Sequence, residues 1–141
     1  MRPRLPAVVD TGVFGARLSP RSPIAARYQP LLDGRPVFVS FQTVAELNYG
    51  ARLARWGSAR TARLQALIDR AVIVWPGPTL VDVYAQLRVD CVRIGHALGQ
   101  RVHDADRWIA ATAVHLGVPL IAHDAVFKDT PGLVLETMLD E

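Results

Sequence analysis

The sequence predicts an α/β protein: a three-layer α/β/α sandwich around a central parallel sheet of four to five strands. The expected strands are short and continuous in apolar residues, which is typical of strands that are buried on both faces of a sheet. They alternate with stretches that have the period of amphipathic helices, so helices connect one strand to the next. In sheets of this kind, sites gather at the carboxyl ends of the strands.

The first half of the chain supplies two of the expected strands. In order, the elements are a strand over 6–10, a helix over 24–32, a strand over 36–40, a helix directly after it and a helix over 59–70. Asp10 ends the first strand, and residues 11–16 are too rich in glycine to assign. Ser40 or Thr43 is expected to cap the helix after the second strand, and Gly57-Ser58 to break that helix from the next.

The second half supplies the remaining strands. In order, the elements are a strand over 72–75, a long helix capped by Thr79 and ending at residues 99–101, a helix over 106–116, a strand over 118–122 and a candidate fifth strand over 133–136. The long helix carries apolar residues at every third or fourth position, at Leu80, Val83, Leu87, Cys91, Ile94 and Leu98. No internal repeat or linker interrupts the sequence, so residues 1–141 are expected to form a single domain.

Composition excludes several classes of protein. Half of the 141 residues are apolar and 21% are charged, which is typical of a globular protein and not of a disordered one. No apolar run approaches the roughly 18 residues of a membrane span. The apolar run after the basic N-terminus is too short for a signal peptide. A lone cysteine, Cys91, excludes a disulfide within the chain, so a cytoplasmic protein is expected.

The net charge is +3, and the basic residues are almost all arginine, because Lys128 is the only lysine among the 16. Arginine forms a two-pronged fork that matches phosphate well. The excess of positive charge is compatible with a polyanionic partner, and equally with a slightly basic, solvated surface.

Four acidic residues are expected to meet at the carboxyl edge of the sheet. Asp10 and Asp124 end the first and fourth strands, Glu46 lies early in the helix after the second strand, and Asp106 begins the helix before the fourth. Each has an ordinary structural explanation when taken singly, as a turn residue, a helix cap or part of an exposed helical face. Their joint position at one edge is what suggests a site.

Such a group of carboxylates needs a compensating cation. Two carboxylates 4 Å apart repel each other by about 4 kcal/mol at an effective dielectric constant near 20. Hard divalent ions with oxygen ligands, Mg²⁺ or Mn²⁺, fit this donor set. An ion of this kind can bind a phosphate oxygen and activate water for attack. An acidic metal centre in a basic protein therefore suggests hydrolysis of a phosphodiester chain.

At these residues the sequence resembles the PIN domain family, and specifically the VapC-type ribonuclease toxins. Four stretches carry the resemblance, in the family's order and with fitting spacing: residues 8–11, 43–47 with Gly50, 106–113 and 120–127. The third, Asp106 with the Arg107-Trp108-Ile109-Ala110-Ala111 that follows it, is the most specific. The resemblance covers nearly the whole chain.

The resemblance implies a PIN-like sandwich and a Mg²⁺-dependent endoribonuclease that cleaves transfer or ribosomal RNA and so inhibits translation and growth. It also implies a homodimer, neutralised by a VapB-type antitoxin in a heterotetramer or larger assembly. By position, Asp10 and Asp106 would hold the metal directly, and Glu46 and Asp124 through water or a second ion. Thr11 would be an auxiliary hydroxyl in the same pocket.

Several points stay open at the level of sequence. Asp104 lies two residues before Asp106 and is a candidate helper, and His123 stands where the family often has Arg, Asn or another polar residue. Four arginines follow Glu46 along the chain, and RNA, the antitoxin or solvent are all candidates to contact them: Arg52, Arg55, Arg60 and Arg63. Trp56, beside them, is a candidate to stack on a base, to anchor a partner or to pack in the core.

Two rival interpretations use the same residues. The His-Asp pairs at 103–104 and 123–124 suggest an HD-type phosphohydrolase, but that fold is all-helical and the expected strands argue against it. The second is a catalytically silent PIN-like module that binds RNA or protein. The four acids argue against it, because a binding module has no need of them.

Overall fold

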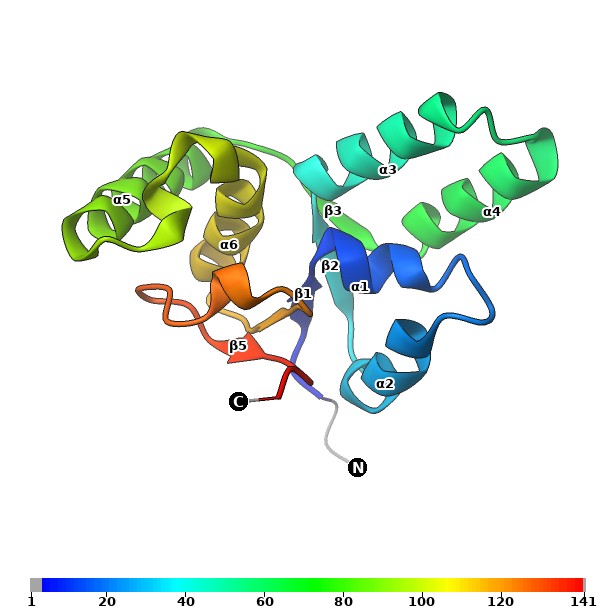
Figure 1. Ribbon diagram of the computed structural model, residues 1–141, viewed down its shortest axis with the longest axis horizontal. Coiled ribbons are helices and arrows are strands. Elements are labelled where there is room, and N and C mark those ends of the chain that lie inside the picture. Colours follow the sequence, from blue (N-terminus) through cyan, green and yellow to red (C-terminus); the bar gives the residue numbers. More distant parts are fainter. Residues whose placement is uncertain (1–3, 141) are drawn as a thin grey trace.

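A parallel sheet of five strands, in the order β3-β2-β1-β4-β5, forms the centre of the computed structural model, which describes residues 4–140 (Figure 1). The strands are β1 (Ala7–Val9), β2 (Val37–Ser40), β3 (Val72–Val74), β4 (Leu120–Ile121) and β5 (Leu135–Glu136). The helices are α1 (Thr11–Ala16), α2 (Pro23–Leu32), α3 (Phe41–Leu53), α4 (Ser58–Asp69), α5 (Pro78–Ile94) and α6 (Asp104–Leu116). Three short 3₁₀ turns complete the fold: η1 (Ala97–Gly99), η2 (Arg101–His103) and η3 (Ala125–Phe127).

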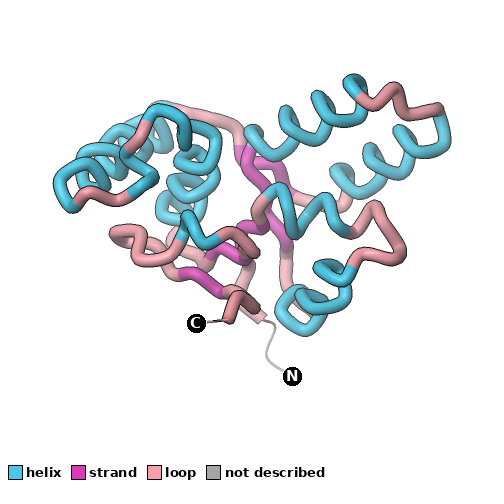
Figure 2. The backbone as a smooth tube through the Cα atoms, in the orientation of Figure 1, coloured by secondary structure: helices cyan, strands magenta, loops and turns pink. Residues whose placement is uncertain are grey.

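Helices cover both faces of the sheet. Helices α1 to α4 lie on one side and α5 and α6 on the other, with the strands running between the two groups (Figure 2). This confirms the predicted three-layer α/β/α class. Within residues 4–140, no helix combines the length and the apolar character that crossing a bilayer requires. The basic start of the chain, at residues 1–3, lies outside the described residues.

Strand β1 is the central strand and supplies both cores. Val8 pairs with Phe38 on β2 and with Leu120 on β4, and all three residues of β1 are fully buried. Because side chains alternate along a strand, Ala7 and Val9 pack against the α1–α4 layer while Val8 packs against α5 and α6. The expectation that the first and fourth strands are parallel neighbours is confirmed.

The glycine-rich segment that the sequence left unassigned is helix α1. Asp10 is its N-cap, and the Asp10 carboxylate accepts a hydrogen bond of 2.9 Å from the backbone N–H of Val13. Ser40, and not Thr43, caps α3, since its hydroxyl oxygen accepts from the backbone N–H of Gln42 at 3.1 Å.

The prediction for the long helix was wrong at both ends. The N-cap of α5 is Gly77, with no side-chain cap, and Thr79 already lies inside the helix after Pro78. The helix ends at Ile94, because Gly95 adopts the left-handed conformation (φ of 72°) that stops a helix. Leu98 is buried in η1 instead, while Ile94 is 62% exposed and does not belong to the buried stripe.

The edge strand β5 is held by an ion pair that spans much of the chain. The guanidinium of Arg35, just before β2, donates two hydrogen bonds to the carboxylate of Glu136, at 2.8 and 3.0 Å. These hydrogen bonds lower the pKa of Glu136 below its ordinary value. The same guanidinium also donates to the backbone carbonyl of Leu31, so the pair joins β5 to the end of α2.

Helix α6 begins at Asp104, two residues before its predicted start, and contains a wholly buried arginine. Arg107 donates from one terminal nitrogen to the carbonyl oxygens of Leu98 and Gln100, at 2.6 and 3.1 Å. Its other terminal nitrogen donates to the Tyr84 hydroxyl and to the Asp104 carboxylate, at 2.7 and 3.0 Å. Arg107 thus ties α6 to α5 and to the turns between them.

Replacing Arg107 with alanine is expected to lower the free energy of unfolding by about 3 kcal/mol, because it leaves buried carbonyl groups without donors. Urea denaturation followed by circular dichroism measures the change. Arg93→Ala, on the exposed side of α5, is the matched control and should shift stability by less than about 0.5 kcal/mol. Equal effects of the two substitutions would contradict the structural role of Arg107.

Candidate active site

A cavity of about 440 Å³ lies at the carboxyl edge of the sheet, where β1 and β4 end. Five elements contribute to it: α1 with its N-cap, α2, α3, α6 and the segment after β4. Its lining residues are Asp10, Thr11, Gly12, Ile24, Glu46, Asp106, Ile109, His123, Asp124 and Ala125. The four acids and the threonine that the sequence singled out are thus brought together.

Asp10 is the most buried of these acids, with 6% of its surface exposed. Burial raises its pKa from 3.8 to about 7, the hydrogen bond from Val13 opposes that shift, and the negative charges of Asp124, Asp106 and Glu46 add to it. Near neutral pH, therefore, the carboxyl of Asp10 is shared between its charged and neutral forms. A cation in the cavity would favour the charged form.

Asp106 lies on the first turn of α6 and faces the cavity from the opposite layer of the sandwich. Its carboxylate lies 3.1 Å from Nδ1 of His103. Asp104, only two residues earlier, does not line the cavity. Its carboxylate instead accepts hydrogen bonds from Tyr84 and from the buried Arg107.

Glu46 and Thr11 are held by contacts from α3. The carboxylate of Glu46 accepts a hydrogen bond of 3.3 Å from the side-chain amide of Gln42, one turn earlier. The Thr11 hydroxyl donates to the hydroxyl of the buried Thr43 at 3.0 Å, which ties the start of α1 to α3. Both contacts fix where these side chains enter the cavity.

Asp124 combines a structural role with its position in the cavity. One carboxylate oxygen accepts a hydrogen bond of 3.0 Å from the backbone N–H of Val126 and so caps η3. Asp10 caps α1 in the same way, with a single oxygen. Within residues 4–140 the second oxygen of each carboxylate, Oδ2, makes no hydrogen bond. Serving as a cap therefore leaves each of these acids one oxygen for a ligand.

The donor set fits a hard divalent cation. Within residues 4–140 no three His, Cys, Asp or Glu side chains are placed to coordinate one ion together. Mg²⁺ commonly binds to one or two carboxylates and keeps several of its waters. A pair such as Asp10 and Asp106, supported by the other two acids through water, meets that requirement.

The cavity also contains residues that the sequence did not assign to it. Ile24 and Ile109 form apolar walls, and no pattern in the sequence marked Ile24. His123 lines the cavity as well, next to Asp124. Two signals could have found it: its departure from the family pattern and its position next to Asp124 at the end of the fourth strand.

The arginine cluster does not reach this cavity. The four side chains are exposed around the turn that joins α3 to α4: Arg52, Arg55, Arg60 and Arg63. Trp56, in the same turn, packs partly against the core, and the Arg60 guanidinium lies 4.1 Å above the centre of its ring. The α3–α4 hairpin extends away from the sheet (Figure 1).

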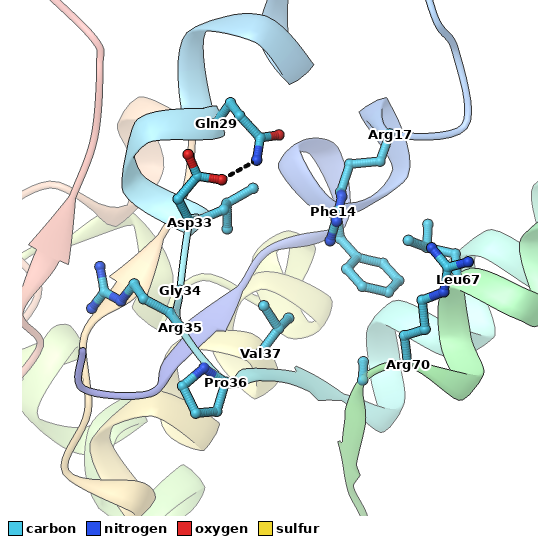
Figure 3. A pocket seen from close by; sticks show the side chains of 12 residues that line it. Phe14, Arg17, Gln29, Asp33, Gly34, Arg35, Pro36, Val37, Leu67 and Arg70 are labelled. Atoms are coloured by element: carbon cyan, nitrogen blue, oxygen red, sulfur yellow. Dashed lines mark hydrogen bonds between the residues drawn. The ribbon is translucent and has the colours of Figure 1, made fainter. Parts of the chain in front are cut away.

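A second cavity, of about 300 Å³, lies near the amino-terminal end of β2 and contains none of the four acids. Arg17 and Arg70 flank Phe14 on one side of it, and a hydrogen bond between Gln29 and Asp33 lies on the other (Figure 3). Its lining is therefore basic where the lining of the first cavity is acidic.

The model of the PIN domain family matches residues 7–133. The chain belongs to the PIN domain family. No curated protein matches the sequence significantly.

Solved structures share the fold of this PIN domain. The VapBC2 complex of Rickettsia felis bound to promoter DNA contains a chain with a TM-score of 0.77 and 20% identity, over 95% of this chain and 98% of that one. For DNA-bound VapBC of Salmonella typhimurium the TM-score is 0.75 and the identity is 24%, over 95% of this chain and 98% of that one. For VapBC-5 of Mycobacterium tuberculosis the TM-score is 0.65 and the identity is 27%, over 96% of this chain and 98% of that one. The family model thus shows the family, and the neighbours show that the same fold extends over nearly the whole chain.

Proposed function

We propose that this PIN domain is a VapC-type toxin that cleaves cellular RNA with the help of Mg²⁺ or Mn²⁺. The observation that carries the proposal is the convergence of four carboxylates in one cavity at the carboxyl edge of the sheet. The raised pKa of Asp10, which burial and its acidic neighbours cause, supports a cation there. A catalytically silent binding module would not need four carboxylates that repel one another in one cavity.

In this proposal Asp10 and Asp106 hold the cation, and Glu46 and Asp124 support it through water or a second ion. The cation would neutralise charge on the phosphate and lower the pKa of a water molecule. Hydrolysis adds water across a P–O bond, so the attacking water loses a proton and the leaving oxygen gains one. The carboxylate of Glu46 or Asp124, which would reach the cation through water, would accept the first proton. Thr11, fixed by Thr43, adds a hydroxyl at the cavity wall.

The charge distribution suits an RNA substrate. Apart from the four acids of the cavity, the chain has nine acidic residues against 16 basic ones, an excess of seven positive charges. Positive charge attracts the phosphate backbone whatever its sequence. The exposed arginines of the α3–α4 turn are candidates for this contact and equally for contact with an antitoxin.

We further propose a VapB-type antitoxin as the partner that neutralises the toxin in the cytoplasm. Several neighbours in fold come from toxin–antitoxin assemblies, among them VapBC of Haemophilus influenzae and a complex from Klebsiella pneumoniae. The proposed assembly is a toxin homodimer with two or more antitoxin chains. Coexpression with the small open reading frame expected next to the toxin gene, followed by light scattering, gives its composition.

Purified protein is expected to cleave total RNA in the presence of Mg²⁺ or Mn²⁺ and to stop when EDTA is added, because the acidic cavity needs the cation to bind phosphate. Gel analysis of the RNA measures cleavage, and mapping of new 5′ ends in cells after induction distinguishes a transfer RNA from a ribosomal RNA target. RNA binding without cleavage under either ion would favour the silent module. Cleavage that persists in EDTA would refute the metal dependence.

A further inference from the structure

We infer that His123 is a hydrogen-bond donor to an RNA phosphate in the acidic cavity, and that the buried Tyr28 holds its imidazole in the tautomer that makes it one. The inference rests on the proposed function and adds to it a hydrogen-bond donor among the acids. His123 follows β4 directly and lines the same cavity as Asp10 and Asp106.

The partner that fixes His123 is Tyr28, on α2, whose side chain is fully buried. The Tyr28 hydroxyl lies 2.7 Å from Nδ1 of His123, and the two rings meet edge to face with their centres 5.4 Å apart. Three other groups surround the hydroxyl. They are the carbonyl of Ala122 at 3.1 Å, the hydroxyl of Thr137 at 3.2 Å and the backbone N–H of Met138 at 2.9 Å.

The distances indicate which way these hydrogen bonds run. A tyrosine hydroxyl donates one hydrogen bond and accepts two. Met138 donates to it through its backbone N–H. The hydroxyls of Tyr28 and Thr137 lie 3.2 Å apart, and either of them can be the donor. The single proton of Tyr28 has two other acceptors within reach, Nδ1 of His123 at 2.7 Å and the Ala122 carbonyl at 3.1 Å.

The distance of 2.7 Å between the Tyr28 hydroxyl and Nδ1 is typical of a hydroxyl donor, whereas N–H donors most often lie about 2.9–3.0 Å from their acceptor. Nδ1 is also nearer to the hydroxyl than the Ala122 carbonyl, which lies 3.1 Å away. We therefore assign the Tyr28 proton to Nδ1. In a neutral imidazole the other nitrogen, Nε2, then carries the hydrogen.

This tautomer places a side-chain N–H donor among the acids of the cavity. Within residues 4–140, Nε2 of His123 has no hydrogen-bond partner. Its polar neighbours in the cavity include the carboxylates of Asp10, Asp106 and Asp124, which accept hydrogen bonds and repel phosphate. An N–H group at the cavity wall can pair with a phosphate oxygen. We therefore assign His123 to substrate binding and Tyr28 to positioning.

The tautomer is tested without any catalysis by long-range ¹H–¹⁵N correlation of the imidazole groups at pH 8. The resonances of His123 are assigned by their loss in His123→Gln. We expect a protonated Nε2 and an unprotonated Nδ1 in the wild type, and a mixture of tautomers in Tyr28→Phe. A wild-type spectrum with protonated Nδ1, or a tautomer unaffected by Tyr28→Phe, would overturn the positioning role.

The substrate contact is tested by the kinetics of RNA cleavage. His123→Ala is expected to lower kcat/KM by about 10- to 100-fold, the usual effect of losing one hydrogen bond to a charged group. His123→Gln should restore much of it, since its amide N–H can take the place of Nε2–H, whereas His123→Asn should not. His115→Ala, at the far end of α6, is the matched control and should behave as wild type.

The outcomes separate the two proposals. Metal-dependent cleavage that is the same in the wild type and in His123→Ala would overturn the assignment of His123 and leave the proposed function standing. No cleavage by the wild type would overturn the proposed function together with the RNA contact. The imidazole spectra would then still decide whether Tyr28 sets the tautomer of His123.

Discussion

Asp10→Asn and Asp106→Asn are each expected to abolish RNA cleavage and growth arrest. The amide keeps the shape of the side chain but loses the charge that would hold the proposed divalent cation. The loss should exceed the roughly 10- to 100-fold typical of residues that only support a metal ligand. Cleavage of a labelled RNA by each purified variant measures the effect. Circular dichroism checks that each variant is folded, which we expect because an asparagine at position 10 can still cap α1.

Two further substitutions make this result specific. Asp82→Asn removes an exposed carboxylate from α5 and should leave cleavage unchanged. Asp104→Asn changes a carboxylate that lies outside the cavity and pairs with Arg107, so it should affect stability more than cleavage. If Asp104→Asn abolished cleavage and Asp106→Asn did not, the acid of the third motif would be Asp104 and not Asp106.

The second large effect concerns stability, because burial disfavours the charged form of the Asp10 carboxyl. Its pKa is about 7 in the folded chain against 3.8 ordinarily, so between these values the folded state binds a proton that the unfolded state has lost. The contribution of Asp10 to stability is therefore full below about pH 4 and is lost as the pH rises to about 7. At about 1.4 kcal/mol per pKa unit, the loss is on the order of 4 kcal/mol.

Asp10→Asn, which cannot ionise, is accordingly expected to be more stable than the wild type at pH 8 in EDTA, and similar to it at pH 4. Urea denaturation at the two pH values measures the difference. Adding Mg²⁺ at pH 8 should raise the Tm of the wild type, since a ligand of the folded state stabilises it, but hardly that of the variant. If the free energy of unfolding changed with pH in the same way for both proteins, the raised pKa of Asp10 would be contradicted.

Most of the architecture could be predicted from the sequence because its signals are local. The apolar run before Asp10 and the one before His123-Asp124 mark the two neighbouring strands at the middle of the sheet. The parallel topology then places the acids that follow them at one edge. The same reasoning brought Glu46 and Asp106 to the cavity, where the structure has them.

What could not be predicted depends on contacts between distant residues or on single backbone angles. Helix α5 stops because Gly95 turns left-handed, although the apolar period continues to Leu98. The environment of Tyr28 is formed by Ala122, His123 and the C-terminal Thr137 and Met138, about a hundred residues away. No periodic pattern in the sequence reports such an encounter.

The two separate cores on either side of β1 have a consequence for how the site can fail. Asp10 and Glu46 are carried by the α1–α4 layer, whereas Asp106 belongs to the α5–α6 layer. The carboxylates of the cavity therefore come from both layers and meet at the boundary between them. Partial opening of either layer, at a free energy below that of global unfolding, separates them. The proposed hydrolysis would then require both layers to be folded at the same time, and one intact layer alone would have no activity.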